Sequence, residues 1–434
     1  MHADQVALST ALHDPAWTAA QRRLLALAAL AFCADGLANQ ALSLALPALI
    51  KVWSVPREAF AAVTAAGFVG VAIGAISGGL LGDTVGRKRG LIGSILLFGV
   101  TTAAAAWAEG LNSLMLLRLL SGLGIGGAIP NGAALVFECT PARHRNLAMG
   151  IAMTFIPIGG MVAGLLGGIL LPRTGWSGLF LACGLLPILL ALALVMMLQE
   201  SPLFLARAAG ASSAGAPAAG ASSPRRRFPI RALFAPGLAA DTAALWVAFF
   251  FCLLASYALL AWVPAMLIGQ GFALAASSWG MMGLNFGSMT GSVLSGWAIG
   301  RVGSRIPGTL VALGALLGAV VLGTVSFGPQ RAAFTMGALF FEGFCLGGLH
   351  NTLYSVSAHM YGLQMRATGV GGASGAGRLG AVLSAFTGAL SLKLGGASGY
   401  FIVIAAAAGL SLAGLTFIRR QIRTDEPQGI IAGL

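Results

Sequence analysis

The chain has 434 residues, of which 58% are hydrophobic and only 9% are charged. A soluble domain carries about 25% charged residues, so this composition excludes a water-exposed globular surface and indicates a membrane protein. The formal net charge of +13 is then a signal of membrane topology, and nucleic-acid binding is not expected.

Apolar runs recur along the whole chain, and each is long enough to cross a hydrocarbon core of about 30 Å as a helix. The first run follows Arg22 and Arg23 and lacks a small-residue cleavage site, so we expect it to remain in the mature protein. We predict an all-α membrane protein with twelve transmembrane helices. The predicted spans cover residues 24–49, 60–82, 90–108, 113–136, 146–171, 177–198, 242–268, 277–299, 306–327, 331–355, 367–391 and 397–418.

A long polar segment separates the first six spans from the last six. Its Ala, Gly, Ser and Pro content is typical of a flexible linker, and a basic cluster follows that would lie near anionic headgroups. The predicted parts are a cytoplasmic N-terminal tail, a six-helix bundle, a cytoplasmic linker, a second six-helix bundle and a cytoplasmic C-terminal tail. These parts span residues 1–23, 24–198, 199–240, 241–418 and 419–434.

The placement of basic residues orients the chain. If both termini are cytoplasmic, most Lys and Arg residues lie on the inner side, as is usual for membrane proteins. The exceptions outside the spans are Lys51, Arg57, Arg173, Arg331 and Lys393. We therefore predict a multi-pass protein of the plasma membrane, the inner membrane of a bacterium.

The two halves of the chain resemble each other. The stretch "GGLLGDTVGRKR" at 78–89 recurs in degraded form as "SGWAIGRVGSR" at 295–305, and "SGLGIGGAIPN" at 121–131 recurs as "EGFCLGGLHN" at 342–351. An offset near 220 residues indicates a duplicated six-helix unit. Repeats of this kind suit two pseudo-symmetric bundles that rock about a central site.

The turn between the second and third spans concentrates charge in an otherwise apolar chain. Any cytoplasmic turn gathers basic residues, but the full pattern Gly79-x3-Asp83-x2-Gly86-Arg87-Lys88 is more specific. It resembles the signature loop of the major facilitator superfamily, in which the loop latches the two halves together on the cytoplasmic side in the outward-open state. The resemblance implies a gating role for these five residues.

The second copy of this loop has Gly300 where the first has Asp83, so a second latch is expected to be weaker or absent. Further segments, "RLLSGLGIGGAIPN", "ECTPARHR", "QESPLFLAR" and "MRATGVGGASGAGRLGA", resemble the aromatic acid:proton symporter family. This resemblance covers nearly the whole chain outside the linker and the tails. That family usually carries Asp-Gly-x-Asp in its first span, whereas this chain keeps Asp35 and has Ala38 in place of the second acid.

Ionisable residues within membrane spans are functional hypotheses, because leaving one in lipid costs about 3 kcal/mol or more. Four positions qualify: Asp35, Arg118, Glu342 and Arg378. Asp35 and Arg378 each lie eleven residues from the predicted cytoplasmic start of their span. At 1.5 Å per residue, this places both about 16 Å deep, near the bilayer midplane.

Arg378 is the candidate anchor for an anionic substrate, because a guanidinium binds a carboxylate through two parallel hydrogen bonds and keeps its charge when desolvated. The alternative is a structural ion pair with Asp35 or Glu342. Asp35 is the candidate proton site, since a nearby arginine and a low dielectric act in opposite directions on its proton affinity. Its alternative role is that of a hydrogen-bond acceptor between helices. Glu342 is a second proton-coupling candidate, with simple pairing as its alternative.

The remaining substrate-binding candidates are polar residues near these charges. Asn39 and Gln40 extend the polar face of the first span, and Arg118 either faces the cavity or extends outward to the membrane surface. His350 and Asn351 lie together in the tenth span. A lone histidine of this kind is either a packing residue or a polar member of the site.

Together these patterns predict a secondary active transporter that takes up a small organic anion, with an aromatic carboxylate favoured, and uses the proton as the coupling ion. No GxxxxGK[ST] loop is present, so ATP is not the expected energy source and no cofactor is expected. Three alternatives remain: a proton-coupled drug antiporter of the same fold, which Arg378 disfavours, a transport-inactive sensor, and a membrane-embedded enzyme. An enzyme would need a clustered catalytic set that five scattered histidines do not supply. The expected partners are the carboxylate and the lipid bilayer, with no obligate protein partner evident.

Overall fold

A computed structural model describes residues 18–141, 144–201, 204–205, 233–325, 328–361 and 365–422. Most of the predicted linker, at 206–232, lies outside the described residues, as do the tails before residue 18 and after residue 422. The described residues form long helices joined by short connections, and no strand occurs among them. The predicted all-α class is therefore confirmed.

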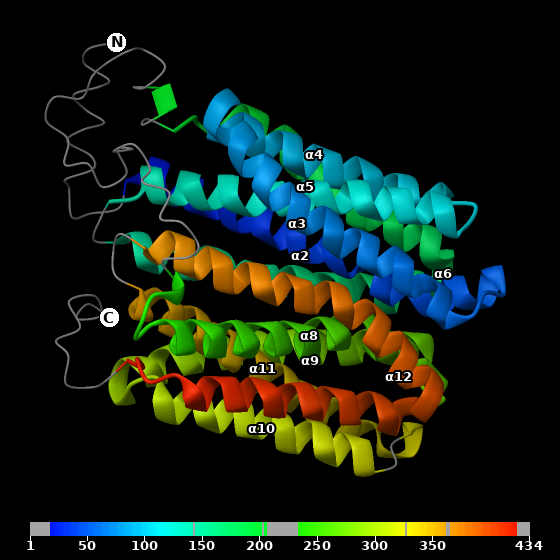
Figure 1. The fold of residues 1–434 in the computed structure, drawn as a ribbon. Helices are drawn as coiled ribbons and strands as arrows, with labels where there is room; N and C mark the ends of the chain where they lie inside the picture. Colours follow the sequence, from blue (N-terminus) through cyan, green and yellow to red (C-terminus); the bar gives the residue numbers. More distant parts are fainter. Residues whose placement is uncertain are drawn as a thin grey trace, which may run out of the picture. The chain divides into compact units, whose positions relative to one another are not determined.

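The first six predicted spans correspond to five continuous helices, whose ends lie close to the predicted boundaries or a few residues beyond them. They are α2 Ala19–Trp53, α3 Phe60–Val85, α4 Arg87–Ala104, α5 Leu111–Cys139 and α6 Arg145–Met197 (Figure 1). Short 3-10 helices, η1 at Arg57–Ala59 and η2 at Ala105–Trp107, complete the turns before α3 and after α4.

The last six predicted spans correspond to a second set of five helices. They are α8 Ala239–Gly269, α9 Leu274–Val302, α10 Arg305–Thr324, α11 Ala332–Met360 and α12 Arg366–Phe417, with the 3-10 helix η5 at Pro329–Arg331 before α11 (Figure 1).

The helices α6 and α12 each contain two predicted spans. They have 53 and 52 residues, and each has a break at a glycine with positive φ: Gly175 at φ 68° and Gly396 at φ 57°. Such a φ is accessible to glycine at little cost. Nine described helices are long and apolar enough to cross a membrane. With α6 and α12 each counted as two spans and the more polar α9 added, they provide the twelve predicted spans.

Within each half, glycines let the second and the fourth span pack closely against each other. A Cβ at Gly122 of α5 would collide with the main-chain oxygen of Gly67 in α3, and a Cβ at Gly343 of α11 would collide with that of Leu284 in α9. Small residues at such crossings let membrane helices pack backbone against backbone. The same packing recurs at equivalent places in the repeat, which supports the inferred duplication.

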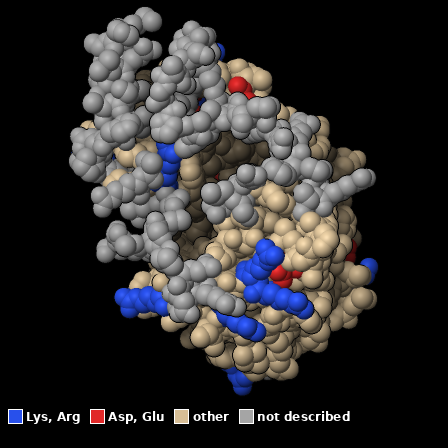
Figure 2. All heavy atoms as spheres, turned by 60° about the vertical axis from the view of Figure 1, so that its left-hand side comes forward, with Lys and Arg blue, Asp and Glu red and all other residues tan. Residues whose placement is uncertain are grey.

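The described residues fall into two compact units. The first is drawn from 1–45, 66–166 and 173–222, and the second from 46–65, 167–172 and 223–434. The predicted domain boundaries remain a prediction. Figure 2, which brings the left-hand side of Figure 1 forward, shows Lys and Arg in small groups on a surface made mainly of other residues.

Candidate functional site

In the second unit, close packing of α12 against α8 positions Arg378. A Cβ at Gly380 would collide with the main-chain oxygen of Phe250, and a Cβ at Gly377 would stand 3.3 Å from that of Phe249. The first half of α12 therefore approaches the backbone of α8 on both sides of Arg378. The side chain is held at a fixed place along α8 rather than on a mobile loop.

The Arg378 side chain is half-buried. Among the described residues of the second unit, none forms a hydrogen bond or ion pair with its guanidinium. His350 of α11 lies close enough to interact electrostatically with Arg378. A guanidinium in this situation has its full hydrogen-bonding fork available for an anion.

His350 is one of three rings that form an aromatic cluster. Phe249 and Tyr354 are edge to face at 5.0 Å between centroids, His350 and Tyr354 are also 5.0 Å apart, and Phe249 and His350 are 6.4 Å apart. These are favourable aromatic geometries. The Nε2 atom of His350 is buried and has no hydrogen-bond partner among the described residues. His350, a predicted substrate residue, is thus part of an aromatic cluster, and it lies near the separately predicted Arg378.

Two hydroxyl residues of this region were missed by sequence reasoning. The hydroxyls of Tyr354 and Ser374 are 3.1 Å apart and join α11 to α12. The signal that was available is their spacing, since Tyr354 lies four residues after His350 and Ser374 lies four residues before Arg378. Residues i and i+4 share one face of a helix.

Asn351, another predicted substrate residue, has a different environment. Its amide donates to the main-chain oxygen of Ser292 at 3.1 Å, across the crossing of α11 with α9. In the first half, Asn131 of α5 donates to the main-chain oxygen of Gly78 in α3 at 2.9 Å. The structure therefore gives Asn351 a packing contact that recurs in the repeat, and its role toward substrate stays a prediction.

Glu342 is fully buried in α11, at 0% exposure. Neither carboxyl oxygen has a hydrogen-bond partner among the described residues, and Oε2 lies 2.6 Å from where a Cβ at Gly318 of α10 would stand. The predicted pairing alternative therefore finds no counterpart within the described part of this unit. The carboxyl lies in a space that the absence of a side chain at Gly318 leaves open.

In the first unit, the polar face of α2 is largely buried. Asp35 is 4% exposed and Gln40 is 6% exposed, while Asn39 is half-buried. A Cβ at Gly36 would collide with the main-chain oxygen of Ile156 in α6, so Asp35 lies next to a close helix crossing. The predicted depth of Asp35 is consistent with this burial.

Arg118 points toward α2 rather than toward the membrane surface. It is 6% exposed, and its guanidinium donates to the main-chain oxygens of Ala38 at 3.4 Å and Asn39 at 3.2 Å. The side chain is therefore not extended outward, and its role toward substrate stays a prediction. Ala38, which replaces the second first-span acid of the resembled family, offers its carbonyl to this arginine.

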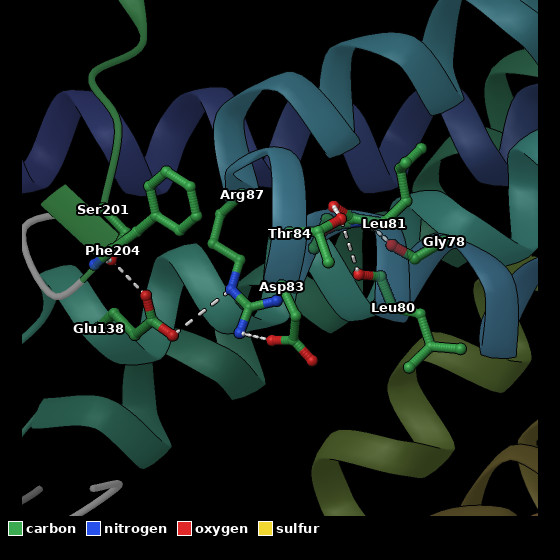
Figure 3. A network of polar contacts seen from close by, with 10 residues as sticks. Gly78, Leu80, Leu81, Asp83, Thr84, Arg87, Glu138, Ser201 and Phe204 are labelled. Carbon is green, nitrogen blue, oxygen red and sulfur yellow. Dashed lines mark hydrogen bonds and ion pairs between the residues drawn. The ribbon is translucent and has the colours of Figure 1, made fainter. Parts of the chain in front are cut away.

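The charged turn between α3 and α4 forms a polar network within the first unit (Figure 3). Arg87 forms an ion pair with Asp83, and its Nε lies 3.6 Å from Oε1 of Glu138 at the end of α5. Glu138 in turn accepts a hydrogen bond from the hydroxyl of Ser201. The turn itself is possible because Gly86 adopts φ 114°.

The segment after α6 braces this turn. Oε1 of Glu200 accepts hydrogen bonds from the main-chain N–H of Lys88 and of Ser201, both at 2.9 Å. Lys88 donates through Nζ to the main-chain oxygen of Val195 at 2.9 Å, and Gly79 lies near Pro130 of α5. Sequence reasoning found the loop but not its acidic partners, which lie far from it in the sequence.

The second unit has a neutral counterpart of this brace. Gly303, at φ 75°, stands where the first copy has Gly86, and Ser304 stands at the place of Arg87. The main-chain N–H of Ser304 donates to the oxygen of Ile422 at 3.1 Å, and its hydroxyl donates to Oε1 of Gln421 at 3.4 Å. The predicted weaker second latch is consistent with these uncharged contacts.

Twelve membrane-spanning helices with a twofold internal repeat and isolated charges inside the spans have the organisation of a secondary transporter. The model of the Major Facilitator Superfamily matches residues 28–385, and the chain belongs to this superfamily. It is a multi-pass integral membrane transporter and not an enzyme, and the predicted family resemblance is confirmed.

The chain is 35% identical to the 3-(3-hydroxy-phenyl)propionate transporter of Escherichia coli (strain K12), over 88% of this chain and 89% of that protein. It is 31% identical to the 4-hydroxybenzoate transporter of Pseudomonas aeruginosa, over 86% and 87% of the two chains. The crystal structure of a D-xylose-proton symporter is similar in fold, with a TM-score of 0.73 at 16% identity, covering 93% of this chain and 98% of that one.

Proposed function

We propose that this transporter carries a small aromatic carboxylate inward across the bacterial inner membrane together with protons, by alternating access. The observation that carries the proposal is the half-buried guanidinium of Arg378, which has no hydrogen bond or ion pair with the described residues of its unit and lies beside an aromatic cluster. A carboxylate supplies the missing acceptors, and the cluster suits an aromatic ring.

The names of the relatives support the substrate class. The proteins of Escherichia coli and Pseudomonas aeruginosa that this chain resembles are transporters of a hydroxyphenylpropionate and of 4-hydroxybenzoate, both aromatic carboxylates. In this proposal the carboxylate binds Arg378, and the rings of His350 and Tyr354 flank the substrate ring. A cationic drug would be repelled by Arg378, which disfavours the drug antiporter.

The proton is the proposed coupling ion, and no other cofactor is required. Asp35 and Glu342 are the candidate carriers, because both are carboxyl groups buried in membrane helices at 4% and 0% exposure. Protonation lets such a group cross between states of different solvent access without moving a bare charge through an apolar interior. Both termini are proposed to be cytoplasmic, in accordance with the distribution of basic residues.

Transport assays in proteoliposomes test the proposal. Uptake of labelled 4-hydroxybenzoate should rise when the outside is acidified, because inward proton flow then drives accumulation, and should collapse with a protonophore. A matched set of vesicles with the membrane potential clamped separates the pH gradient from the voltage. Uptake that is unchanged by the protonophore would exclude proton symport. Export of a cationic dye in exchange for protons would favour the drug antiporter, despite the positive charge of Arg378.

A further inference from the structure

The contacts between α11 and α12 are arranged as two levels along the helix axes. At one level, the hydroxyl of Tyr354 lies 3.1 Å from that of Ser374. At the other, one turn further from that connection along each helix, lie His350 and Arg378. The first pair is nearer the connection between Met360 and Arg366 on both helices, so the two levels follow from an antiparallel pairing of α11 with α12.

The two levels are separated by one helical turn on each helix. His350 and Tyr354 are four residues apart, as are Ser374 and Arg378. At 1.5 Å per residue, the levels lie about 6 Å apart along the axes. This is also the separation between the carboxyl carbon and the hydroxyl oxygen at opposite ends of a hydroxylated benzoate ring.

The hydroxyl pair retains hydrogen-bonding capacity. Each hydroxyl is both a donor and an acceptor, so the single bond between Tyr354 and Ser374 leaves one hydroxyl hydrogen and several lone pairs unused. Tyr354 is 37% exposed, and Ser374 is half-buried, so the pair is not sealed inside the protein. A phenolic hydroxyl, which also donates and accepts, complements such a pair.

We infer that Tyr354 and Ser374 form a subsite for a ring hydroxyl of the substrate, opposite the carboxylate that binds Arg378. The inference rests on the proposed function and narrows it: the preferred substrate is an aromatic acid hydroxylated across the ring from its carboxylate. The ring then spans the two levels alongside the His350 and Tyr354 rings, whose centroids are 5.0 Å apart. Hydroxylation at the ring position next to the carboxylate would place the hydroxyl away from Tyr354 and Ser374.

Equilibrium binding to the purified full-length chain tests the subsite. Benzoate, 2-hydroxybenzoate and 4-hydroxybenzoate are titrated into wild type, Tyr354→Phe and Ser374→Ala. Tyr354→Phe keeps the ring and its contacts with Phe249 and His350 while removing the hydroxyl. Ser391→Ala is the matched control, because the hydroxyl of this buried serine of α12 donates to the main chain of its own helix, at Gly388, at 3.0 Å.

Wild type should bind 4-hydroxybenzoate about tenfold more tightly than benzoate or 2-hydroxybenzoate, as one neutral hydrogen bond of this kind provides. Tyr354→Phe should abolish that preference, Ser374→Ala should reduce it, and the control should preserve it. A wild type that does not distinguish the acids, or a Tyr354→Phe variant that weakens all of them equally, overturns the subsite and leaves the Arg378 anchor standing. Failure of wild type to bind any of the acids overturns the proposed function as well.

Discussion

The two arginines inside the membrane spans have different surroundings. Arg118 donates to two main-chain oxygens of α2 and is 6% exposed, whereas Arg378 is half-buried and has no such partner among the described residues of its unit. An arginine that is already bonded serves the packing of its helices first. Arg378 is therefore the stronger candidate for binding an anion.

Lysine should not replace Arg378. It keeps the positive charge but loses the planar fork and is more easily deprotonated when desolvated, so affinity for the carboxylate should fall by about 1.5–3 kcal/mol. Isothermal titration with 4-hydroxybenzoate measures the loss. Arg305→Lys, at an exposed helix end, is the control and should bind normally. Wild-type affinity in Arg378→Lys would move the anchor elsewhere, with Arg118 as the next candidate.

At this scale, the sequence predicted the charged residues and His350, but not the hydroxyl pair of Tyr354 and Ser374. Depth along a span is enough to single out Asp35, Glu342 and Arg378, because charge inside a membrane is rare and costly. Neither Tyr354 nor Ser374 could be singled out in the same way: both are uncharged, and serines are common in membrane helices, where they usually bond to their own backbone. Only the pairing of α11 with α12 brings these two together.

Among the elements, the loop between α3 and α4 is the one whose partners the sequence could not reveal. Glu138 and Glu200 lie far from Arg87 and Lys88 along the chain, and they meet only because α5 and the end of α6 reach the same turn. The family pattern identified the loop. The fold was needed to show that acids brace it within the first unit.

Asp83→Asn should reduce transport while leaving binding of the aromatic acid intact. The substitution removes the charge that pairs with Arg87, so it changes the balance between states and not the substrate site. Initial rates of uptake, compared with equilibrium binding on the same preparation, separate the two effects. The control is Glu109→Gln, an exposed acid near the start of α5. Normal uptake by Asp83→Asn would reduce the loop to a charged turn.

The helix crossings predict that alanine substitutions at different glycines change the stability of the protein by different amounts. Gly122→Ala should destabilise the protein by about 1–3 kcal/mol, because the added methyl group collides with the Gly67 main chain in α3. Gly93→Ala in α4, where nothing lies within 4 Å of the added carbon, should be neutral or slightly stabilising. Thermal unfolding in detergent measures both. Equal melting temperatures for the two variants would contradict the close crossing of α3 with α5.

For the molecule as a whole, the twelve spans and the internal repeat could be predicted because hydropathy and self-similarity extend over hundreds of residues. The sequence did not show that α6 and α12 are continuous apart from the breaks at Gly175 and Gly396. A break at a single glycine with positive φ can connect two spans as a loop does, and the amino-acid composition of the connection does not distinguish a glycine break from a loop.

Asp35→Asn should separate transport from its coupling to protons. An amide at this position cannot bind and release a proton, so uphill accumulation driven by a pH gradient should be lost. Exchange of labelled for unlabelled 4-hydroxybenzoate at equal concentrations, which needs no net proton movement, should persist. Arg378→Lys is the useful comparison, because a weakened anchor should lower both activities together. Accumulation that survives in Asp35→Asn would assign the proton to Glu342 or another group.

The braces at the turns after α3 and after α9 are alike in position but different in electrical character. Glu200 supports the first turn through a carboxylate, with an ion pair beside it at Asp83 and Arg87, whereas Gln421 supports the second through an amide and a serine hydroxyl. Dissolved ions screen charges and leave neutral hydrogen bonds nearly unaffected. Added salt would therefore loosen the charged contacts of the first brace more than the uncharged contacts of the second, so duplication has produced two turns of the same shape that differ in their response to ionic strength.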